Sequence, residues 1–523
     1  MAGKMLISCK KSWKVRVFDP CRRLLKLSLV VFFVVGLYPL LGAEQLQPQA
    51  LEFTGTCMLR QIEPQLTGRG VTVGAICRSM TYIDTEPQND YRPYTSHRCF
   101  AGKNVSFFDD GWIEAGFSGH STAISSILIG SDPNAFYSPL GRFEYEGIVP
   151  QADLYVYEFW YFVTDYVFPN RWPQVDVLTM SVGSAFEDWW TRGIDSMAER
   201  FGLVIVAGIG NGRKAFDPPL YPAAGANVIA VGVVDSNDAN GFVSSLANFT
   251  VPDPDHSSAG PTSDGRCKPD IVAPGNCLAA IVGTQDGYYA TGDYSSFAAP
   301  VVAGIAGLLI QKAKSDPNLW PVLSPMAGNC LIKSILMTSA RKLPGWHKGY
   351  STDSDDYQHP LDFRQGAGLV DALAAYNVLM GGMQLPGEVN AIGWDNNILD
   401  PNTGGEEVYE FDVNDVGGVL AATLVWNKVY EDRYPFKPVA RRNADLKLEL
   451  WGLELNDMGD YVLLDRSDSA VDNVEHLYTL LDGRYGKYEL VVSFSTESPT
   501  ASVPYAISWK PAVPESVDDM HYE

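Results

Sequence analysis

Between residues 68 and 380, short uninterrupted runs of apolar residues alternate with stretches of helical character. Uninterrupted apolar runs of strand length are typical of strands buried on both faces of a parallel sheet. Their alternation with helices predicts an α/β domain with a mainly parallel sheet. We expect strands at Val71–Ile76, Leu154–Tyr157, Val175–Met180, Leu203–Ala207 and Val228–Val231, and helices at Thr122–Leu128, Trp189–Arg200 and Phe297–Lys314.

After about residue 384 the apolar residues recur at every second position instead. Val408–Val413, Leu446–Leu450 and Ala506–Trp509 alternate in this way, and turns rich in Gly, Asp and Asn separate the runs. This pattern predicts a small antiparallel β-sandwich. We therefore divide the chain into residues 44–384, an α/β domain, residues 385–512, a C-terminal β-sandwich domain, and residues 513–523, an acidic tail.

The first 43 residues differ from the rest of the chain. They contain eight basic residues against one acidic residue, followed by the apolar stretch Leu27–Leu41 and the small residues Gly42 and Ala43. A basic head, an apolar middle and a small residue before a polar start are typical of a secretory signal peptide. The apolar stretch is shorter than the roughly 20 residues that span a bilayer. We predict a secreted or periplasmic protein with no stable membrane span after the signal is cleaved.

Charge and cysteine content restrict the partners. The whole chain has a net charge of −23, and removing the basic segment makes it still more negative, which argues against nucleic-acid binding. Six cysteines follow the signal: Cys57, Cys77, Cys99, Cys267, Cys277 and Cys330. An even number in an exported protein suggests disulfides, and Cys77 with Cys99 is one pairing to consider. None of the six has the spacing of a zinc site.

A serine lies at the start of the apolar helix predicted after residue 296. A nucleophile placed there would benefit from the free N–H groups and the dipole of the helix, although most such serines only cap helices. The segments Ser295–Gly304, Ser257–Thr262 and Lys268–Gly275 together resemble the nucleophile region of the subtilisin-like serine peptidases, the subtilases. The resemblance spans about residues 68 to 380 and implies a three-layer subtilisin-like fold with Ser296 as nucleophile.

Three further segments are similar to subtilase motifs. Gly119–Ala123 matches the histidine motif, which implies that His120 is the general base. Val206–Gly212 resembles the strand end whose asparagine supplies an oxyanion hydrogen bond, a role that falls to Asn211. Met180–Gly183 resembles the segment that pairs with an extended substrate, so Ser181, Val182 and Gly183 are the expected substrate-binding residues.

The chain departs from the family at the third member of the catalytic triad. Subtilases place an aspartate at the end of the first strand, and here Cys77 stands at that position. Seven residues later, the segment Ile83–Thr85 resembles the family's aspartate motif, with Asp84 as the aspartate. Three alternatives remain open: Asp84 reaches back to His120, cysteine is tolerated in a weak enzyme, or the acid and the activity are lost. We expect Cys77 beside His120 with no carboxylate at the usual place.

Two smaller departures affect the cleft. Ser121 replaces the glycine after the histidine, and Tyr294 replaces the glycine two residues before the serine, so both side chains could narrow the cleft. No cofactor is required by this chemistry. Subtilases often bind structural calcium, and Asp353, Asp355 and Asp356 could supply ligands, although acidic loops are usually only solvated.

The sequence leads to two functional hypotheses. The first is an exported serine endopeptidase that cleaves protein or peptide substrates through an acyl-enzyme, attenuated if the triad acid is displaced or lost. The second is a weak or inactive pseudo-peptidase that binds protein or polysaccharide outside the cell. The intact Ser296, His120 and Asn211 favour the first hypothesis, and Cys77 favours the second.

Overall fold

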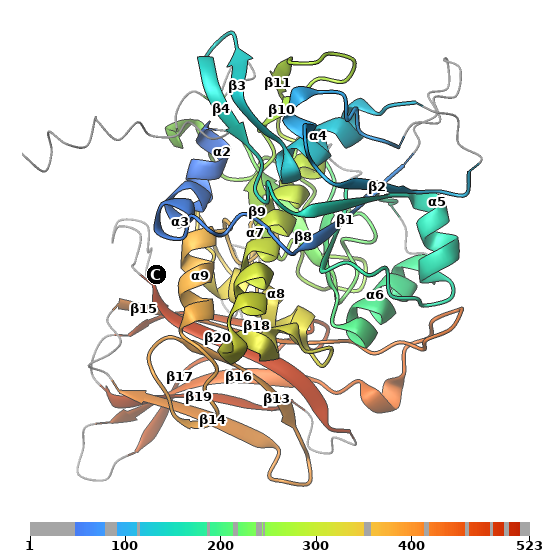
Figure 1. The fold of residues 1–523 in the computed structure, drawn as a ribbon. Helices are drawn as coiled ribbons and strands as arrows, with labels where there is room; N and C mark the ends of the chain where they lie inside the picture. The colour runs from blue at the N-terminus through green and yellow to red at the C-terminus, as the bar shows by residue number, and fades with distance from the viewer. Residues whose placement is uncertain are drawn as a thin grey trace, which may run out of the picture. The chain divides into compact units, whose positions relative to one another are not determined.

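The computed structural model describes most of the chain from residue 48 to residue 512 (Figure 1). The described ranges are 48–78, 91–111, 116–185, 189–212, 218–236, 243, 246–349, 357–412, 418–454, 460–481, 485–495 and 501–512. The predicted signal segment, Asp84, the three calcium candidates Asp353, Asp355 and Asp356, and the acidic tail all lie outside these residues.

A seven-stranded sheet forms the centre of the α/β region. Its strand order is β2-β5-β1-β6-β7-β8-β9, and every neighbouring pair is parallel. The expected fold class, a subtilisin-like α/β domain with a parallel sheet, is therefore confirmed. The strands are β1 (Thr72–Cys77), β2 (Val105–Phe108), β5 (Asp153–Glu158), β6 (Val177–Met180), β7 (Val204–Gly208), β8 (Ile229–Val234) and β9 (Ile271–Pro274).

Helices cover both faces of this sheet, as expected for a sheet built from uninterrupted apolar strands. Alternate residues of each strand enter different cores: Val204 and Val206 of β7 pack on one face, and Ile205 and Ala207 on the other. The first face is covered by α4 (Gly119–Ile129) and α7 (Ser295–Ser315). The opposite face is covered by α5 (Phe159–Phe162), the π-helical turn η2 (Val163–Val167) and α6 (Trp189–Phe201).

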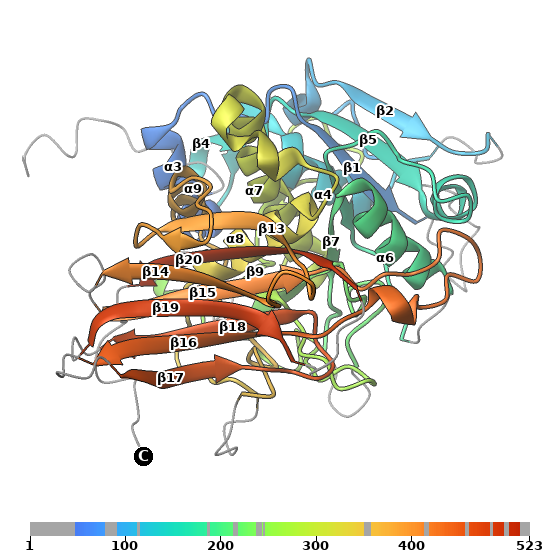
Figure 2. The ribbon, with the colours of Figure 1, turned by 90° about the horizontal axis from the view of Figure 1, so that it is seen from below.

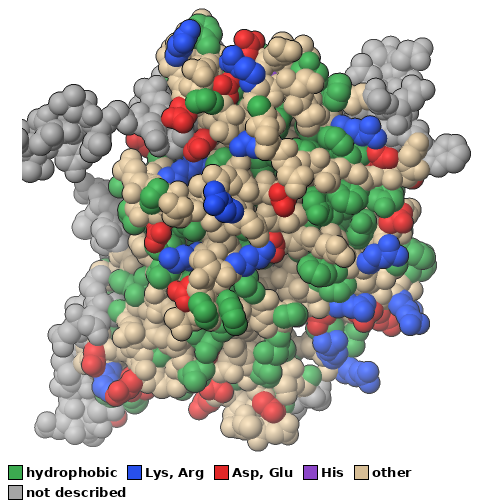
Figure 3. Space-filling view, viewed as in Figure 1, with side chains coloured by type: hydrophobic (Ala, Val, Ile, Leu, Met, Phe, Trp, Pro, Cys, Tyr) green, Lys and Arg blue, Asp and Glu red, His purple; other side chains and the backbone are tan. Residues whose placement is uncertain are grey.

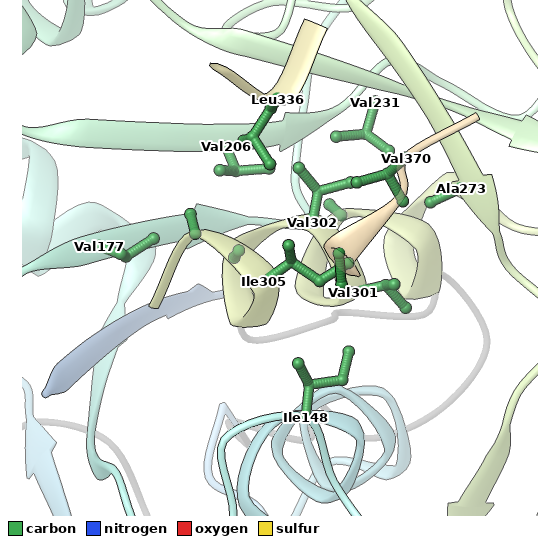
Figure 4. Close-up of a cluster of buried hydrophobic side chains, with 14 of the residues drawn as sticks. Ile148, Val177, Val206, Val231, Ala273, Val301, Val302, Ile305, Leu336 and Val370 are labelled. Carbon is green, nitrogen blue, oxygen red and sulfur yellow. The ribbon is translucent and has the colours of Figure 1, made fainter. Parts of the chain in front are cut away.

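Helix α7 is the centre of the larger core. Its side chains Val301, Val302 and Ile305 meet strand residues and Ile148, which comes from the loop before β5 (Figure 4). Among the described helices, α7 alone is long and apolar enough to cross a membrane, but 83% of that apolar window is buried inside the fold. Its hydrophobicity thus serves internal packing.

Smaller elements complete this region. Two antiparallel hairpins pair β3 (Ser131–Tyr137) with β4 (Gly141–Glu146) and β10 (Leu278–Ala280) with β11 (Tyr288–Ala290). The remaining helices are α2 (Pro48–Phe53), α3 (Thr56–Ile62), α8 (Gly328–Ser339) and α9 (Ala372–Met380), with short 3₁₀ turns at Arg98–Phe100, Leu246–Asn248, Pro317–Leu323 and Ala440–Arg442.

The C-terminal region forms two sheets that stack face to face (Figure 2). The five-stranded sheet has the order β12-β14-β19-β16-β17, and the four-stranded sheet has the order β13-β20-β15-β18. Neither sheet adds a strand to the central parallel sheet, so the expected all-β sandwich is confirmed. The strands are β12 (Gly387–Glu388), β13 (Gly393–Leu399), β14 (Glu406–Asp412), β15 (Gly418–Trp426), β16 (Leu446–Glu454), β17 (Tyr461–Ser467), β18 (Val474–Leu481), β19 (Tyr485–Phe494) and β20 (Val503–Ala512).

The four-stranded sheet packs against α8 through a buried polar layer. The Ser334 hydroxyl lies 2.7 Å from both the carbonyl oxygen of Thr423 on β15 and the hydroxyl of Ser508 on β20. Thr338 donates to the hydroxyl of Thr423 at 2.8 Å. A layer of short polar side chains with satisfied hydrogen bonds fixes the register of the helix on the sheet.

The cysteine side chains contradict the prediction of disulfides. Cys77, Cys99, Cys267, Cys277 and Cys330 are buried free thiols. The prediction of disulfides is wrong for these five residues, including the pairing of Cys77 with Cys99. Buried cysteines behave as small apolar residues, and here they fill the core of a domain large enough to be stable without cross-links.

The surface is mixed in charge on the face shown in Figure 3. Acidic and basic side chains are scattered among apolar ones, without a broad area of a single sign.

Candidate active site

The expected catalytic segments meet at the carboxyl edge of the parallel sheet, where open α/β folds place their ligand sites. Strand β1 ends at Cys77, β6 ends just before Ser181, and β7 ends three residues before Asn211. Helices α4 and α7, which pack on each other within the larger core, begin with His120 and Ser296 in their first turns. The topology therefore brings together residues that are up to 219 positions apart.

Ser296 is the second residue of α7 and is half-buried. The first N–H groups of a helix have no acceptor within the helix, so the N–H of Ser296 belongs to a set that can serve an anion. The carbonyl oxygen of Ser296 accepts a hydrogen bond from the Ser181 hydroxyl at 2.7 Å. That bond fixes the start of α7 to the segment after β6.

Asn211 is held by Ser295, the residue before the expected nucleophile. Its Oδ1 accepts hydrogen bonds from the Ser295 N–H at 2.8 Å and from the Ser295 hydroxyl at 2.9 Å. A backbone N–H can only donate, so the side-chain atom that faces it must be the amide oxygen. The Nδ2 group of Asn211 is thereby directed away from Ser295, and its role as an oxyanion donor stays a prediction.

His120 lies half-buried in the first turn of α4, which Ser118 caps by accepting from the Ser121 N–H at 3.1 Å. Its ring packs on Phe297, the residue after Ser296, with 5.6 Å between ring centroids. Burial lowers the pKa of His120 to about 4. Among the described residues, no carboxylate hydrogen-bonds either ring nitrogen, so no ionic partner opposes this effect of burial.

The hydrogen bond expected between Ser296 and His120 stays a prediction. Both side chains flank Phe297 at the starts of adjacent helices, and the described hydrogen bonds do not include one that joins them. Catalytic hydrogen bonds are often long in enzymes without substrate and tighten in the complex.

Cys77 is the last residue of β1 and is almost fully buried. Because successive side chains of a strand alternate in direction, Cys77 points with Val73 and Ala75 toward α4 and α7, whereas Ile76 points toward α6. The Ser121 side chain, next to His120, interacts with the thiol. Burial nevertheless raises the pKa of Cys77 to about 11, so the thiol is uncharged at neutral pH.

The two side chains expected to narrow the cleft, Ser121 and Tyr294, differ in exposure. Ser121 is buried and interacts with the Cys77 thiol, so its side chain does not reach the surface. Tyr294 is 48% exposed and packs edge-on against Phe297, the residue after Ser296.

The expected substrate segment follows β6 directly. Ser181 and Val182 are half-buried and Gly183 is exposed. Ser184 then forms an antiparallel bridge with Tyr221. A side chain at Gly183 would approach the Tyr221 carbonyl oxygen to 3.0 Å, so glycine permits the close approach of these two segments. Main-chain recognition of an extended peptide by this segment stays a prediction.

Two features of the site escaped the sequence analysis. The Ser295 side chain, which orients Asn211, has no distinguishing sequence signal because any small polar residue could precede a nucleophile. A cluster of Asp235, His256 and Asp293 also lies close to the nucleophile loop, and its three residues come from segments 21 and 37 positions apart in the chain. Only the fold brings them together.

A profile of the Subtilase family matches residues 68–368, more than half of the chain. The chain belongs to the subtilase family. This confirms the resemblance drawn from the sequence motifs, and the matched range contains Cys77, His120, Asn211 and Ser296.

Two relatives illustrate where the similarity lies. The C5a peptidase of Streptococcus pyogenes is 40% identical to this subtilase over 119 residues, which are 23% of this chain and 9% of the relative. The membrane-bound transcription factor site-1 protease of Rattus norvegicus is 29% identical over 300 residues, 53% of this chain and 22% of the relative. The matches cover less than a quarter of either relative's length.

Among solved structures, the PatG macrocyclase in complex with peptide matches 62% of this subtilase and 95% of its own chain, with a TM-score of 0.42 and 16% sequence identity.

Proposed function

We propose that this subtilase is an exported serine endopeptidase that cleaves protein or peptide substrates through an acyl-enzyme, at a rate attenuated because the triad acid is displaced or lost. The observation that carries the proposal is the arrangement at the start of α7. Ser296 lies in its first turn, and Ser295 binds the side-chain oxygen of Asn211, so that the Asn211 N–H₂ group is turned away from Ser295.

In the proposed mechanism, His120 takes the proton from the Ser296 hydroxyl as the oxygen attacks the scissile carbonyl. The negative charge on the carbonyl oxygen is stabilised by Asn211 Nδ2 and by the free N–H of Ser296. His120 then gives its proton to the leaving amine, and the acyl-enzyme remains. Water activated by His120 releases the acyl group and restores the serine.

Cys77 supports the attenuated rate. A triad acid keeps the histidine in the required tautomer and stabilises its cation. A thiol whose pKa is about 11 supplies no negative charge at neutral pH, and the lowered pKa of His120 makes it a weak base. The proposal has three parts besides the chemistry: Cys77 stands in place of a triad aspartate, this replacement lowers turnover, and the N-terminal segment directs export.

The proposal is tested by labelling with a fluorophosphonate probe, which reacts only with an activated serine. We expect slow labelling of the wild-type chain and none of the Ser296→Ala variant. The matched control is Ser295→Ala, which keeps the nucleophile and removes one of the two hydrogen bonds to Asn211; it should still be labelled, at a reduced rate.

One observation favours the second candidate, a pseudo-peptidase that binds protein or polysaccharide. His120 has no carboxylate partner among the described residues. A folded wild-type protein that the probe never labels, and that binds peptides without cleaving them, would replace the peptidase proposal by this one.

A further inference from the structure

A second cluster of ionisable side chains lies next to the nucleophile loop. Asp235 follows β8 directly, His256 comes from the turn at residues 253–256, and Asp293 lies in the loop before α7. Each residue offers an oxygen or nitrogen atom, and these atoms all lie within 4.8 Å of one another. None of the three takes part in the proposed peptidase mechanism.

The cluster is held in place by a surrounding layer of donors. The Nδ1 atom of His256 lies 2.6 Å from Oδ1 of Asp235. Asp293 accepts hydrogen bonds from the Ser236 hydroxyl at 2.8 and 2.9 Å and from the Ser236 N–H at 3.2 Å. Asn276 in turn donates to the Ser236 hydroxyl at 3.0 Å. Donors of this kind orient metal-binding carboxylates in known sites.

The cluster carries more negative than positive charge. Two carboxylates face one imidazole, and the nearby Asp253 adds to the negative potential at His256. A divalent cation among these three side chains would neutralise the negative charge that they bring together.

We propose that Asp235, His256 and Asp293 form a binding site for a divalent metal ion of the Zn²⁺ type. Imidazole nitrogen and carboxylate oxygen are both ligands of Zn²⁺, and three protein ligands leave the fourth position for water. Calcium prefers six to eight oxygen ligands, and this set does not offer them. His256 is 49% exposed, so its ring can turn from Asp235 toward a shared ion.

An ion at this site would connect two segments that lie near the expected catalytic residues. Asp293 precedes Ser296 by three residues, and the backbone at residues 254–256 packs against Gly212, the neighbour of Asn211. A side chain at Gly212 would come within 2.3 Å of the Pro254 carbonyl oxygen and 2.7 Å of the His256 N–H nitrogen. An ion bound to Asp235, His256 and Asp293 thus links the loop before the expected nucleophile to a turn that supports the expected oxyanion residue.

The test is calorimetric titration of the full chain with ZnCl₂ at pH 7.5, alongside His256→Ala and Asp293→Asn. We expect one zinc ion per chain in the wild type and affinity at least about tenfold weaker in both variants, because even outer-layer ligand partners contribute about 10- to 100-fold. The matched control is Asp255→Asn, an exposed carboxylate in the same turn, which should bind as the wild type does.

Two further measurements make the outcome decisive. Zinc should raise the melting temperature of the wild type and of Asp255→Asn but not of His256→Ala, and EDTA added after zinc should reverse the rise. Equal zinc affinity in wild type and His256→Ala, no zinc binding at all, or a preference for CaCl₂ over ZnCl₂ would overturn the proposal. Fluorophosphonate labelling tests the peptidase function separately, so failure of one proposal leaves the other intact.

Discussion

At the scale of single residues, the environment of His120 has a direct chemical meaning. A general base works best when its pKa lies near the operating pH, because it must both accept and return a proton. Burial lowers the pKa of His120 to about 4, and the neighbouring Cys77 is a neutral thiol. The imidazole is therefore uncharged over the whole neutral range, and no side chain in the described part of the chain supplies a negative charge to the cation that the proposed mechanism forms.

A carboxylate at position 77 should increase peptide hydrolysis. Cys77→Asp places a carboxylate on the side of β1 that faces α4, which should raise the pKa of His120 and the rate of peptide hydrolysis. Loss of the acid alone costs about 3 × 10⁴ in a subtilisin, so a gain of about 10²-fold or more is expected. Cys77→Asn, of similar size and without charge, is the control and should show no such gain.

The pH dependence gives a second readout of the same change. A base whose pKa is about 4 loses activity only as the pH falls through about 4, since protonation removes the base form. In Cys77→Asp the acid limb of kcat/KM should move to higher pH, because a nearby negative charge favours the imidazolium. An unchanged acid limb in this variant would show that residue 77 does not face the ring.

Asn211 permits a substitution that separates its two roles. Asn211→Asp keeps the oxygen that accepts from Ser295 and replaces the outward amide with a negatively charged oxygen. We expect kcat to fall by about 10²–10³-fold or more with KM nearly unchanged, because only the oxyanion is affected. Peptide hydrolysis kinetics check this, and a fall in thermal stability equal to that of Asn211→Ala would instead indicate a purely structural role.

The sequence motifs located the candidate residues but not their interactions. Ser296 and His120 lie in the first turns of helices and Asn211 follows the end of β7 by three residues, as their motifs imply. The place of Cys77 at the end of the first strand also followed from the sequence. The pairing of Ser295 with Asn211 and the cluster around His256 were not predictable, since both depend on contacts between segments distant in the chain.

At the scale of elements, helix α7 combines a catalytic start with an interior that is buried throughout. Its two central glycines meet the core differently. A methyl group at Gly304 would lie 2.6 Å from Cγ2 and 2.7 Å from Cβ of Ile148, closer than packing allows. At Gly307 the nearest atom would be 3.3 Å away, on Val149. Gly304 therefore permits close packing, whereas the space beside Gly307 is nearly large enough for the methyl group of alanine.

We therefore predict opposite behaviour for two matched substitutions. Gly304→Ala should lower the free energy of unfolding by about 1–3 kcal/mol through overpacking. Gly307→Ala should cost much less, or stabilise, because alanine gains up to about 1 kcal/mol in helix propensity. Denaturant unfolding of both variants measures the difference, and equal destabilisation would contradict the packing described here.

The elements themselves were largely predictable. All five strands expected in the α/β region and all three expected helices are present, with ends shifted by a few residues. In the central sheet, strands β2 and β9 were missed: β2 is a partly exposed edge strand, and β9 follows a long irregular segment. Outside that sheet, the hairpins β3–β4 and β10–β11 and the helices α2, α3, α8 and α9 were also missed. The π-helical turn at Val163–Val167 has no local signal in a run of aromatic residues.

At the scale of the whole molecule, the described residues of the α/β region and the sandwich belong to one compact unit. Besides the hydroxyl layer on α8, the side chain of Lys342 lies 2.7 Å from Nε2 of His476 on β18, and both are buried. Burial and the nearby Lys510 and Lys348 lower the pKa of Lys342, and Asp362 opposes this effect. Burial and the positive charges of Lys342 and Lys348 lower the pKa of His476. The contact is compatible with at most one positive charge.

This contact predicts an acid-sensitive stability. His476 has a folded pKa far below its usual 6.5, so below about pH 6.5 the unfolded chain binds a proton that the folded chain does not. The contribution of His476 to stability should therefore fall as the pH decreases from 7 to 5. His476→Gln removes this titration, so its melting temperature should fall less, relative to the wild type, over that range. His120 and His97, whose pKa values are also lowered, act in the same direction, whereas Asp293, Asp445 and Asp472, whose pKa values are raised to about 6, act in the opposite direction.

The hydroxyl layer also bears on how such a chain can change over evolutionary time. Ser334 and Thr338 on α8 find their partners only on β15 and β20 among the described residues. A recombination event that exchanged the C-terminal sheets for an unrelated module would leave these buried hydroxyls without partners, at a cost of about 1–3 kcal/mol each. The sandwich and α8 are therefore expected to be inherited together, and exchanges that succeed should carry a replaced α8 face.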